Sequence, residues 1–151
     1  MAYIKKIRQL VGHRPLIMTS ASGALLNEQG EVLLQERADT GDWGFPGGYM
    51  EFGEIFSQTL IREFKEDAGF AVEPQRLLKI LDSDTYTYPN GDVVQPVNAF
   101  YLVRRTTDHQ YLTKPSETVK TRYFGMHESP HFFNQQHAEM WAVLKEYLTN
   151  R

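Results

Sequence analysis

The chain has 151 residues, of which 41% are hydrophobic, and this length and composition predict one domain, residues 1–151, with a single core. Its 16 basic and 19 acidic residues leave a net charge of −3, which argues against a nucleic-acid coat protein and against a membrane-surface binder. The absence of cysteine excludes a disulfide framework and a thiolate metal site.

The first segment predicts a short amphipathic helix within an N-terminal arm, residues 1–14. In YIKKIRQLVG the apolar residues recur at helical spacing and share one face: Ile4, Ile7, Leu10 and Val11. We expect this helix to dock on its own domain or on a second subunit, and in the second case the protein would be a homodimer. A basic arm that attracts phosphates is the alternative. The segment lacks the apolar run of a signal peptide, and a cytoplasmic protein with no membrane partner is therefore expected.

The next segments predict two strands, a loop and a second helix. LIMTSASGALLNEQGEVLLQER reads as two strands around a turn at Asn27–Gly30. The glycine-rich stretch from Ala38 to Glu54, which contains Pro46, is expected to be a loop. An amphipathic helix should follow from about Glu54 to Ala68, because Gly69 is a good C-terminal breaker.

The remainder predicts further strands and a last helix. Residues 70–88, 93–105 and 119–126 have strand-like composition, and the turn Pro89–Asp92 should join the first two runs as a hairpin. Pro96 suggests an edge or bulged position. Asn134 is a plausible N-cap for a helix with Trp141 and Leu144 on its buried face. Together these elements predict an α/β fold with a mixed sheet covered by helices on two sides.

Three acids on the second predicted helix indicate a cation site. Glu63, Glu66 and Asp67 would fall within an arc of about 100° that borders the buried face, where like charges oppose the helix by roughly 0.2–0.5 kcal/mol per pair. A hard cation compensates such crowding, and oxygen ligands favour Mg²⁺ or Mn²⁺. Mg²⁺ in turn commonly shares its site with substrate phosphate. The alternative is a solvated acidic face, which requires neither the neighbouring glycine loop nor Arg62 and Glu54.

The segment from Gly48 to Phe70 reads G-YMEFG-E-IFSQTLI-RE-F-K-ED-A-GF. It resembles the signature of the Nudix (MutT-like) hydrolases: Gly, five residues, Glu, seven residues, Arg-Glu, an apolar residue, any residue, Glu-Glu, any residue, Gly and an apolar residue. The match has no gap, and its one departure is Asp67, which stands at the second Glu of the Glu-Glu pair. The preceding WGFPGG also resembles the family's approach to this box. The resemblance implies a Nudix-type α/β/α sandwich with a loop–helix catalytic motif.

The resemblance also implies a set of metal ligands. Glu66, Asp67 and the backbone carbonyl of Gly47 are similar to the family's ligands, and a glycine suits close approach of the chain to an ion. Glu63 is implied as a third ligand or as the general base. Glu54 is implied either to bind an additional metal or to anchor the loop. The number of metal ions stays open, because Asp67 is one methylene shorter than the usual Glu.

Other implied roles concern the proton and the substrate. Arg62 corresponds to the residue that orients the acids. The family often takes its base from outside the box, and Glu117 is a candidate, although a surface-loop glutamate is the alternative. Some subfamilies carry a marker downstream: a proline in ADP-ribose hydrolases and a tyrosine in dinucleoside-polyphosphate hydrolases. Tyr86 and Tyr88 stand at the tyrosine position and could stack on a base, but tyrosine is also ordinary in strands.

The implied activity is hydrolysis of the diphosphate linkage of a nucleoside diphosphate joined to another group X. The alternative is a non-catalytic Nudix domain that binds a nucleotide as a sensor or assembly module. Glu63 and Glu66 are retained, which favours the enzyme, and the length leaves no room for an attached effector domain. The five histidines show no metal-ligand spacing, so we expect each to be a surface or structural residue: His13, His109, His127, His131 and His137.

Overall fold

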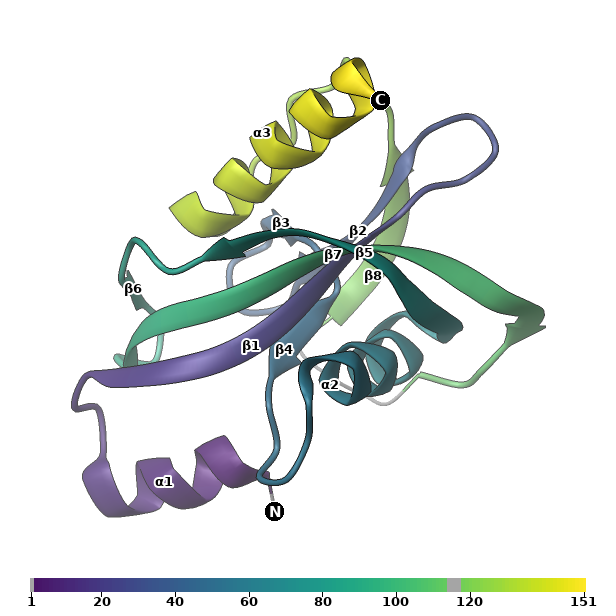
Figure 1. Ribbon diagram of the computed structural model, residues 1–151. Coiled ribbons are helices and arrows are strands. Elements are labelled where there is room, and N and C mark those ends of the chain that lie inside the picture. The colour runs from purple at the N-terminus through teal and green to yellow at the C-terminus, as the bar shows by residue number, and fades with distance from the viewer. Residues whose placement is uncertain (1, 114–117) are drawn as a thin grey trace.

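The computed structural model describes residues 2–113 and 118–151 (Figure 1). In chain order its elements are α1 (Tyr3–Val11), β1 (Leu16–Leu25), β2 (Val32–Arg37), β3 (Trp43–Gly44), β4 (Gly47–Tyr49), α2 (Phe56–Glu63), the π-helical turn η1 (Phe64–Ala68), β5 (Phe70–Leu81), β6 (Tyr86–Thr87), β7 (Val93–Gln110), β8 (Thr118–Phe124) and α3 (Gln135–Asn150). Among the described residues, none of the helices is long and apolar enough to cross a membrane.

The strands form two sheets. The larger sheet is mixed, as predicted, with the order β4-β1-β7-β5 and with β6 also paired to β7. Its β1 and β7 run parallel, whereas the other pairs are antiparallel. The smaller sheet, which was not predicted, is antiparallel with the order β3-β2-β8. The strands β1 and β2 therefore belong to different sheets, and the bridge between Leu26 and Val32 links them beside the predicted turn.

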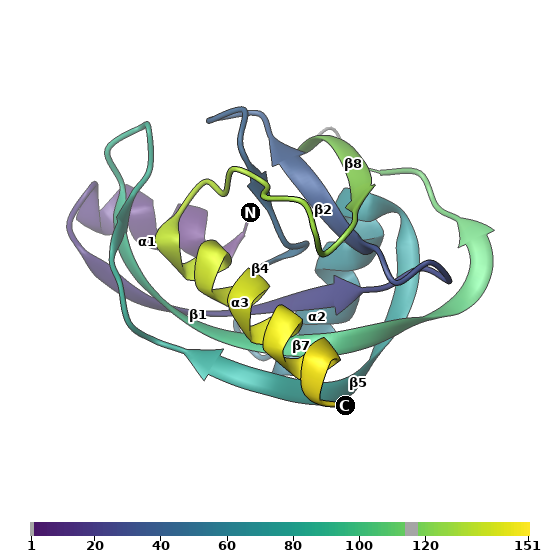
Figure 2. The ribbon, with the colours of Figure 1, turned by 90° about the horizontal axis from the view of Figure 1, so that it is seen from above.

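Helices cover the larger sheet on two sides (Figures 1 and 2). On one side Leu60 and Phe64 are fully buried against β1 and β7 in one core cluster. On the other side Met140 and Leu144 of α3 are fully buried in a second cluster with Phe100. Asn134 caps α3 as predicted, because its Oδ1 accepts a hydrogen bond from the backbone N–H of His137. The predicted α/β sandwich is thus confirmed.

The hairpin between β6 and β7 is also confirmed. The backbone N–H of Tyr88 donates to Asp92 O, and that of Gly91 donates to Tyr88 O. The strand predicted over residues 70–88 is wrong as one element, because residues 82–85 separate β5 from β6. The loop predicted from Ala38 to Glu54 likewise contains the two short strands β3 and β4.

Pro96 does not lie on an edge strand, contrary to the sequence interpretation. Strand β7 is interior, and its register with β1 runs through Pro96 without a bulge. On its other side, β6 pairs only as far as Val94, and β5 begins pairing at Asn98. The carbonyl of Pro96 faces this gap and accepts a bond from Gln136 Nε2 at 3.0 Å. The proline is tolerated because no strand partner requires the missing N–H there.

Helix α1 docks on its own chain. The backbone N–H of Tyr3 donates to Glu51 Oε2 at 2.8 Å, and Arg8 Nη2 donates to Val93 O at 2.7 Å. The predicted apolar face is correct except at Leu10, which is 80% exposed. The helix therefore lies beside the loop that precedes α2, where its first residues reach the cleft described below.

Candidate functional site

The acids lie on a helix whose last turn is widened. Helix α2 begins at Phe56 rather than at Glu54, and the side chain of Gln58 accepts a bond from the backbone N–H of Ile55. The turn η1 follows without a break and ends at Gly69 in the left-handed conformation, φ +75°. Single π-helical turns inside helices are frequent at functional sites. This turn carries Glu66 and Asp67.

Arg62 lies at the centre of the acidic cluster. Its Nε donates to Glu54 Oε2 at 2.8 Å, and its Nη2 donates to Glu54 Oε1 at 2.9 Å. Its Nη1 donates to Glu63 Oε1 at 2.9 Å and lies 3.5 Å from Glu66 Oε2. A further bond from Nη2 reaches Tyr49 O at 3.1 Å. One guanidinium therefore fixes three carboxylates and the loop, since its planar fork suits such bidentate contacts.

Glu54 is held as a loop anchor. Besides the two bonds from Arg62, its Oε1 accepts from Thr59 Oγ1 at 2.9 Å and from the backbone N–H of Glu51 at 2.8 Å. The hydrogen bond from Arg62 is the largest cause that lowers the pKa of Glu54 from 4.5 to about 2. This carboxylate is ionised at neutral pH and does not line the cleft.

Glu63 and Asp67 form a close carboxyl pair. Burial is the first cause that raises the pKa of Glu63 to about 9; the charge of Asp67 and a hydrogen bond with it come next. Arg62 lowers this pKa but does not outweigh the other causes. Two adjacent carboxylates repel each other when both are ionised, and a bound divalent cation would offset this repulsion.

Two glycines allow close packing of strand β4, Gly47 against β1 and Gly48 against Glu63. A Cβ atom built on Gly47 would lie 2.2 Å from Ala21 O, and one built on Gly48 would lie 2.5 Å from Glu63 Oε1. Real Cβ atoms essentially never show contacts this short, so both positions admit only glycine without a shift. Strand β4 can therefore lie directly against Glu63.

We expect Gly48→Ala to lower activity by about 100-fold, because a displacement near 1 Å at a reacting centre has an effect of that size. The new methyl group would push Glu63 away from Arg62 and Asp67. Turnover of the best substrate and the unfolding temperature are the two measurements. The matched control is Gly30→Ala, at a turn with φ +75° and no atom within 4 Å of the new Cβ. That control should lose stability and keep activity; equal activity in both variants would contradict the role of close packing.

The donor set fits a hard divalent cation, because it consists of carboxylate and carbonyl oxygens. Within residues 2–113 and 118–151, however, no group of three or more His, Asp or Glu side chains already has the arrangement of a metal site. The contacts with Arg62 explain this difference, since they engage Glu63 and Glu66. Small rotations of these side chains would be needed when a metal binds.

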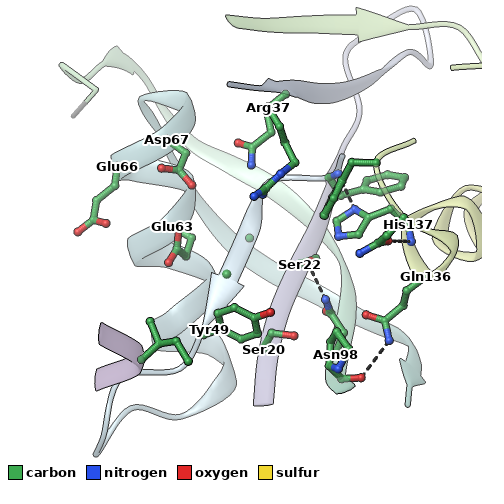
Figure 3. A pocket seen from close by; sticks show the side chains of 18 of the residues that line it. Ser20, Ser22, Arg37, Tyr49, Glu63, Glu66, Asp67, Asn98, Gln136 and His137 are labelled. Carbon is green, nitrogen blue, oxygen red and sulfur yellow. Dashed lines mark hydrogen bonds between the residues drawn. The ribbon is translucent and has the colours of Figure 1, made fainter. Parts of the chain in front are cut away.

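The acids face a cleft of about 620 Å³ (Figure 3). Glu63, Glu66 and Asp67 line it on the side of α2 and η1, whereas Gln136 and His137 of α3 lie across from them. The sequence-predicted residues that line this cleft are Gly47, Arg62, Glu63, Glu66, Asp67 and Tyr88.

The remaining predicted residues lie elsewhere. Tyr86 does not line the cleft but packs its ring behind it, 4.8 Å from the ring of Tyr88 and 5.5 Å from that of Phe133. Tyr88 does line the cleft, and its Oη lies 2.6 Å from Oη of Tyr49, which also lines it. Of the two tyrosines at the marker position, Tyr88 alone therefore lines the cleft. Glu117 lies outside the described residues.

Several cleft residues were not predicted. Arg37 binds Asp39 through two hydrogen bonds of 2.9 and 2.8 Å, and its guanidinium lies 4.3 Å from the centre of the Phe133 ring. His137 accepts a bond from the backbone N–H of Phe45 on Nδ1 at 3.0 Å. Burial, and then the charge of Arg37, lowers the pKa of His137 to about 3, so its ring is neutral with the proton on Nε2.

A signal for other unpredicted residues was present in the strands. Ser20 and Ser22 alternate along β1, as Gln35 and Arg37 do along β2, so each pair points to one face of its sheet. Polar residues at alternate positions of otherwise buried strands indicate a polar cavity rather than a dry core.

Comparisons with known proteins relate this chain to one domain family. The NUDIX domain family model matches residues 17–144. A human (Homo sapiens) 8-oxo-dGDP phosphatase is 47% identical over 36% of this chain and 18% of its own length. A MutT-like protein of Streptomyces ambofaciens is 35% identical over 47% of this chain and 46% of its own. The matched part thus spans less than half of these curated relatives. The crystal structure of an ADP-ribose pyrophosphatase from Streptococcus suis has a TM-score of 0.70 and 26% identity, and the match covers 89% of this chain and 93% of that one.

Proposed function

Because the chain belongs to the Nudix domain family, we propose that it is a divalent-metal-dependent pyrophosphohydrolase. Its substrate would be a nucleoside diphosphate joined to another group X, cleaved at the diphosphate linkage. The observation that carries this proposal is the cluster of carboxylates around Arg62, with the Glu63–Asp67 pair facing the cleft. The names of an ADP-ribose pyrophosphatase and an 8-oxo-dGDP phosphatase among its relatives support the same class of reaction.

The residues that would hold Mg²⁺, or Mn²⁺ in its place, are Glu66, Asp67, Glu63 and the carbonyl of Gly47. When bound, such an ion neutralises phosphate oxygens and lowers the pKa of a bound water. Glu54 is a weaker ligand candidate, because Arg62, Thr59 and the backbone of Glu51 already occupy its oxygens.

The chain's own residues supply positioning and proton transfer. Arg62 holds the acids at the cleft wall, and the close approach of Gly48 fixes Glu63 from the other side. Glu63 is our first candidate for the carboxylate that accepts the proton from the attacking water, since it lines the cleft. Its raised pKa means that it can act as a base only when a bound cation favours its ionised form. Glu117 stays the second candidate, and the variant Glu117→Gln separates the two. Its turnover should be lost only if Glu117 is the base, whereas Glu63→Gln also removes a proposed metal ligand.

A substrate panel tests the proposal. The protein is incubated with Mg²⁺ or Mn²⁺ and with ADP-ribose, nucleotide sugars, dinucleoside polyphosphates, nucleoside triphosphates and dinucleotide coenzymes. We expect turnover of at least one compound, and chelation of the metal with EDTA should abolish it. If no compound is cleaved while a nucleotide binds without metal, the proposal is wrong and the domain is a binding module.

A further inference from the structure

Three buried side chains of the cleft carry polar atoms without a hydrogen-bond partner. They are Ser20 Oγ, Gln35 Oε1 and Asn98 Oδ1, in residues that are 3%, 5% and 4% exposed. The described part of the chain has one other such atom, Arg8 Nε, outside the cleft. Buried polar groups are nearly always paired, because an unpaired one opposes folding. Three of them in one cleft indicate partners that a ligand supplies.

The three residues come from different strands that meet at the cleft. Ser20 lies on β1, Gln35 on β2 and Asn98 on β7, and Asn98 lies far across the cleft from Glu66 and Asp67 (Figure 3). The terminal torsions of the two amides are broad, so a small rotation presents either amide to a ligand. We call this group of three residues the polar pocket; within it, Ser20 and Asn98 are register partners on β1 and β7.

The polar pocket is neutral and presents acceptors. Asn98 Nδ2 already donates to Ser22 Oγ at 3.1 Å, which leaves its carbonyl oxygen for the ligand. Gln35 Oε1 is likewise buried without a partner, so it accepts from a ligand once its amide turns toward the cleft. A ligand group that satisfies these atoms must carry N–H or O–H donors, and the three neutral side chains offer no counter-charge to a charged group. Aromatic rings of Phe45, Tyr88 and Phe133 line the same cleft.

The geometry points to a nucleobase with amino or ring N–H donors as the group that Ser20, Gln35 and Asn98 recognise. This inference rests on the proposed function for the diphosphate end, and it assigns the specificity of the opposite end. A flat heteroaromatic ring suits the surrounding aromatic side chains, and its donors suit the two carbonyl oxygens. Sugar hydroxyls share the donor chemistry, and the test separates the two sources.

Nucleosides without phosphate test the inference without requiring hydrolysis or metal. Dissociation constants for adenosine, guanosine, purine riboside and ribose are measured by NMR titration in EDTA. Purine riboside has a purine ring and no amino group. We expect adenosine or guanosine to bind about 10-fold tighter than purine riboside, as two neutral hydrogen bonds allow. Asn98→Leu should remove that difference.

Two controls separate recognition from structure. Gln95 lies on the same strand, outside the cleft, and bonds Asp82 O at 3.1 Å; Gln95→Leu should keep the preference. Ser20→Ala removes an unpaired buried hydroxyl, so it should raise the unfolding temperature by about 2–4 °C while it weakens nucleoside binding. A purely structural serine would lose stability instead.

Three results would overturn the inference: equal affinity for all three nucleosides, an unchanged preference in Asn98→Leu, or ribose binding as tightly as the nucleosides. The last result would assign the polar pocket to a sugar. None of these measurements depends on cleavage of a diphosphate, so the panel described above can fail while base recognition persists, and the reverse also holds.

Discussion

Replacing Glu66 by glutamine lowers kcat by about 1,000-fold, because the loss of one charged ligand removes several kcal/mol of metal-dependent stabilisation. The side chain is 28% exposed and lies 3.5 Å from Arg62, and glutamine keeps its size. The fold should therefore survive, with a change in unfolding free energy of about 0.5–1 kcal/mol, as for an exposed ion pair. Steady-state turnover of the best substrate and urea unfolding measure the two effects.

The matched control for this variant is Glu73→Gln. Glu73 also pairs with an arginine, Arg104, but it is 44% exposed and lies on β5 outside the cleft. It should leave kcat unchanged. Turnover by Glu66→Gln at the unmodified rate would show that Glu66 is no metal ligand, and an equal loss in Glu73→Gln would show that the effect is unspecific.

The direction of the Asp67 side chain could not be predicted from the sequence. The predicted arc of three acids assumes an α-helix with about 100° per residue. Residues 64–68 instead form a π-helical turn, which changes the angles between Glu63, Glu66 and Asp67. The segment carries no proline or other local signal for this turn. The sequence therefore predicts which acids lie on the helix and in what order, but the directions in which their side chains point follow only from the structure.

Features encoded by neighbouring residues were predicted well. The end of η1 at Gly69, the cap at Asn134 and the turn at Pro89–Asp92 each depend on a few adjacent residues. The far wall of the cleft depends on pairing between distant strands. Ser20 lies opposite Asn98 only because β1 and β7 run parallel in register. No local pattern encodes that register, so the alternating polar residues of β1 could not be placed against Asn98 from the sequence alone.

Arg62→Met should both destabilise the protein and abolish most of its activity. The change removes the cation that faces Glu54, Glu63 and Glu66 and leaves these carboxylates unbalanced at the cleft wall. Removal of one partner of a buried pair is strongly unfavourable, and with Arg62 26% exposed we expect a loss of about 2–4 kcal/mol. Arg104→Met, at the exposed pair with Glu73, should lose under about 1 kcal/mol. Urea unfolding in EDTA compares the two variants.

The pH dependence of the same variant identifies the cause of the loss. In the native protein the pKa of Glu54 is about 2, below its usual 4.5, so Glu54 contributes stability above pH 4.5 that is lost as the pH falls from 4.5 towards 2. The contribution of Glu63 to stability has the opposite sign, because its pKa is raised to about 9 in the folded protein. This contribution lowers stability as the pH rises from 4.5 towards 9, and it does not change stability below pH 4.5. Between pH 4.5 and 2 the native protein should therefore lose about 1–2 kcal/mol through Glu54, after solvent screening, and Arg62→Met should lose much less. Equal losses in both proteins would mean that Arg62 does not stabilise the ionised Glu54, and the anchoring of the loop would then need another explanation.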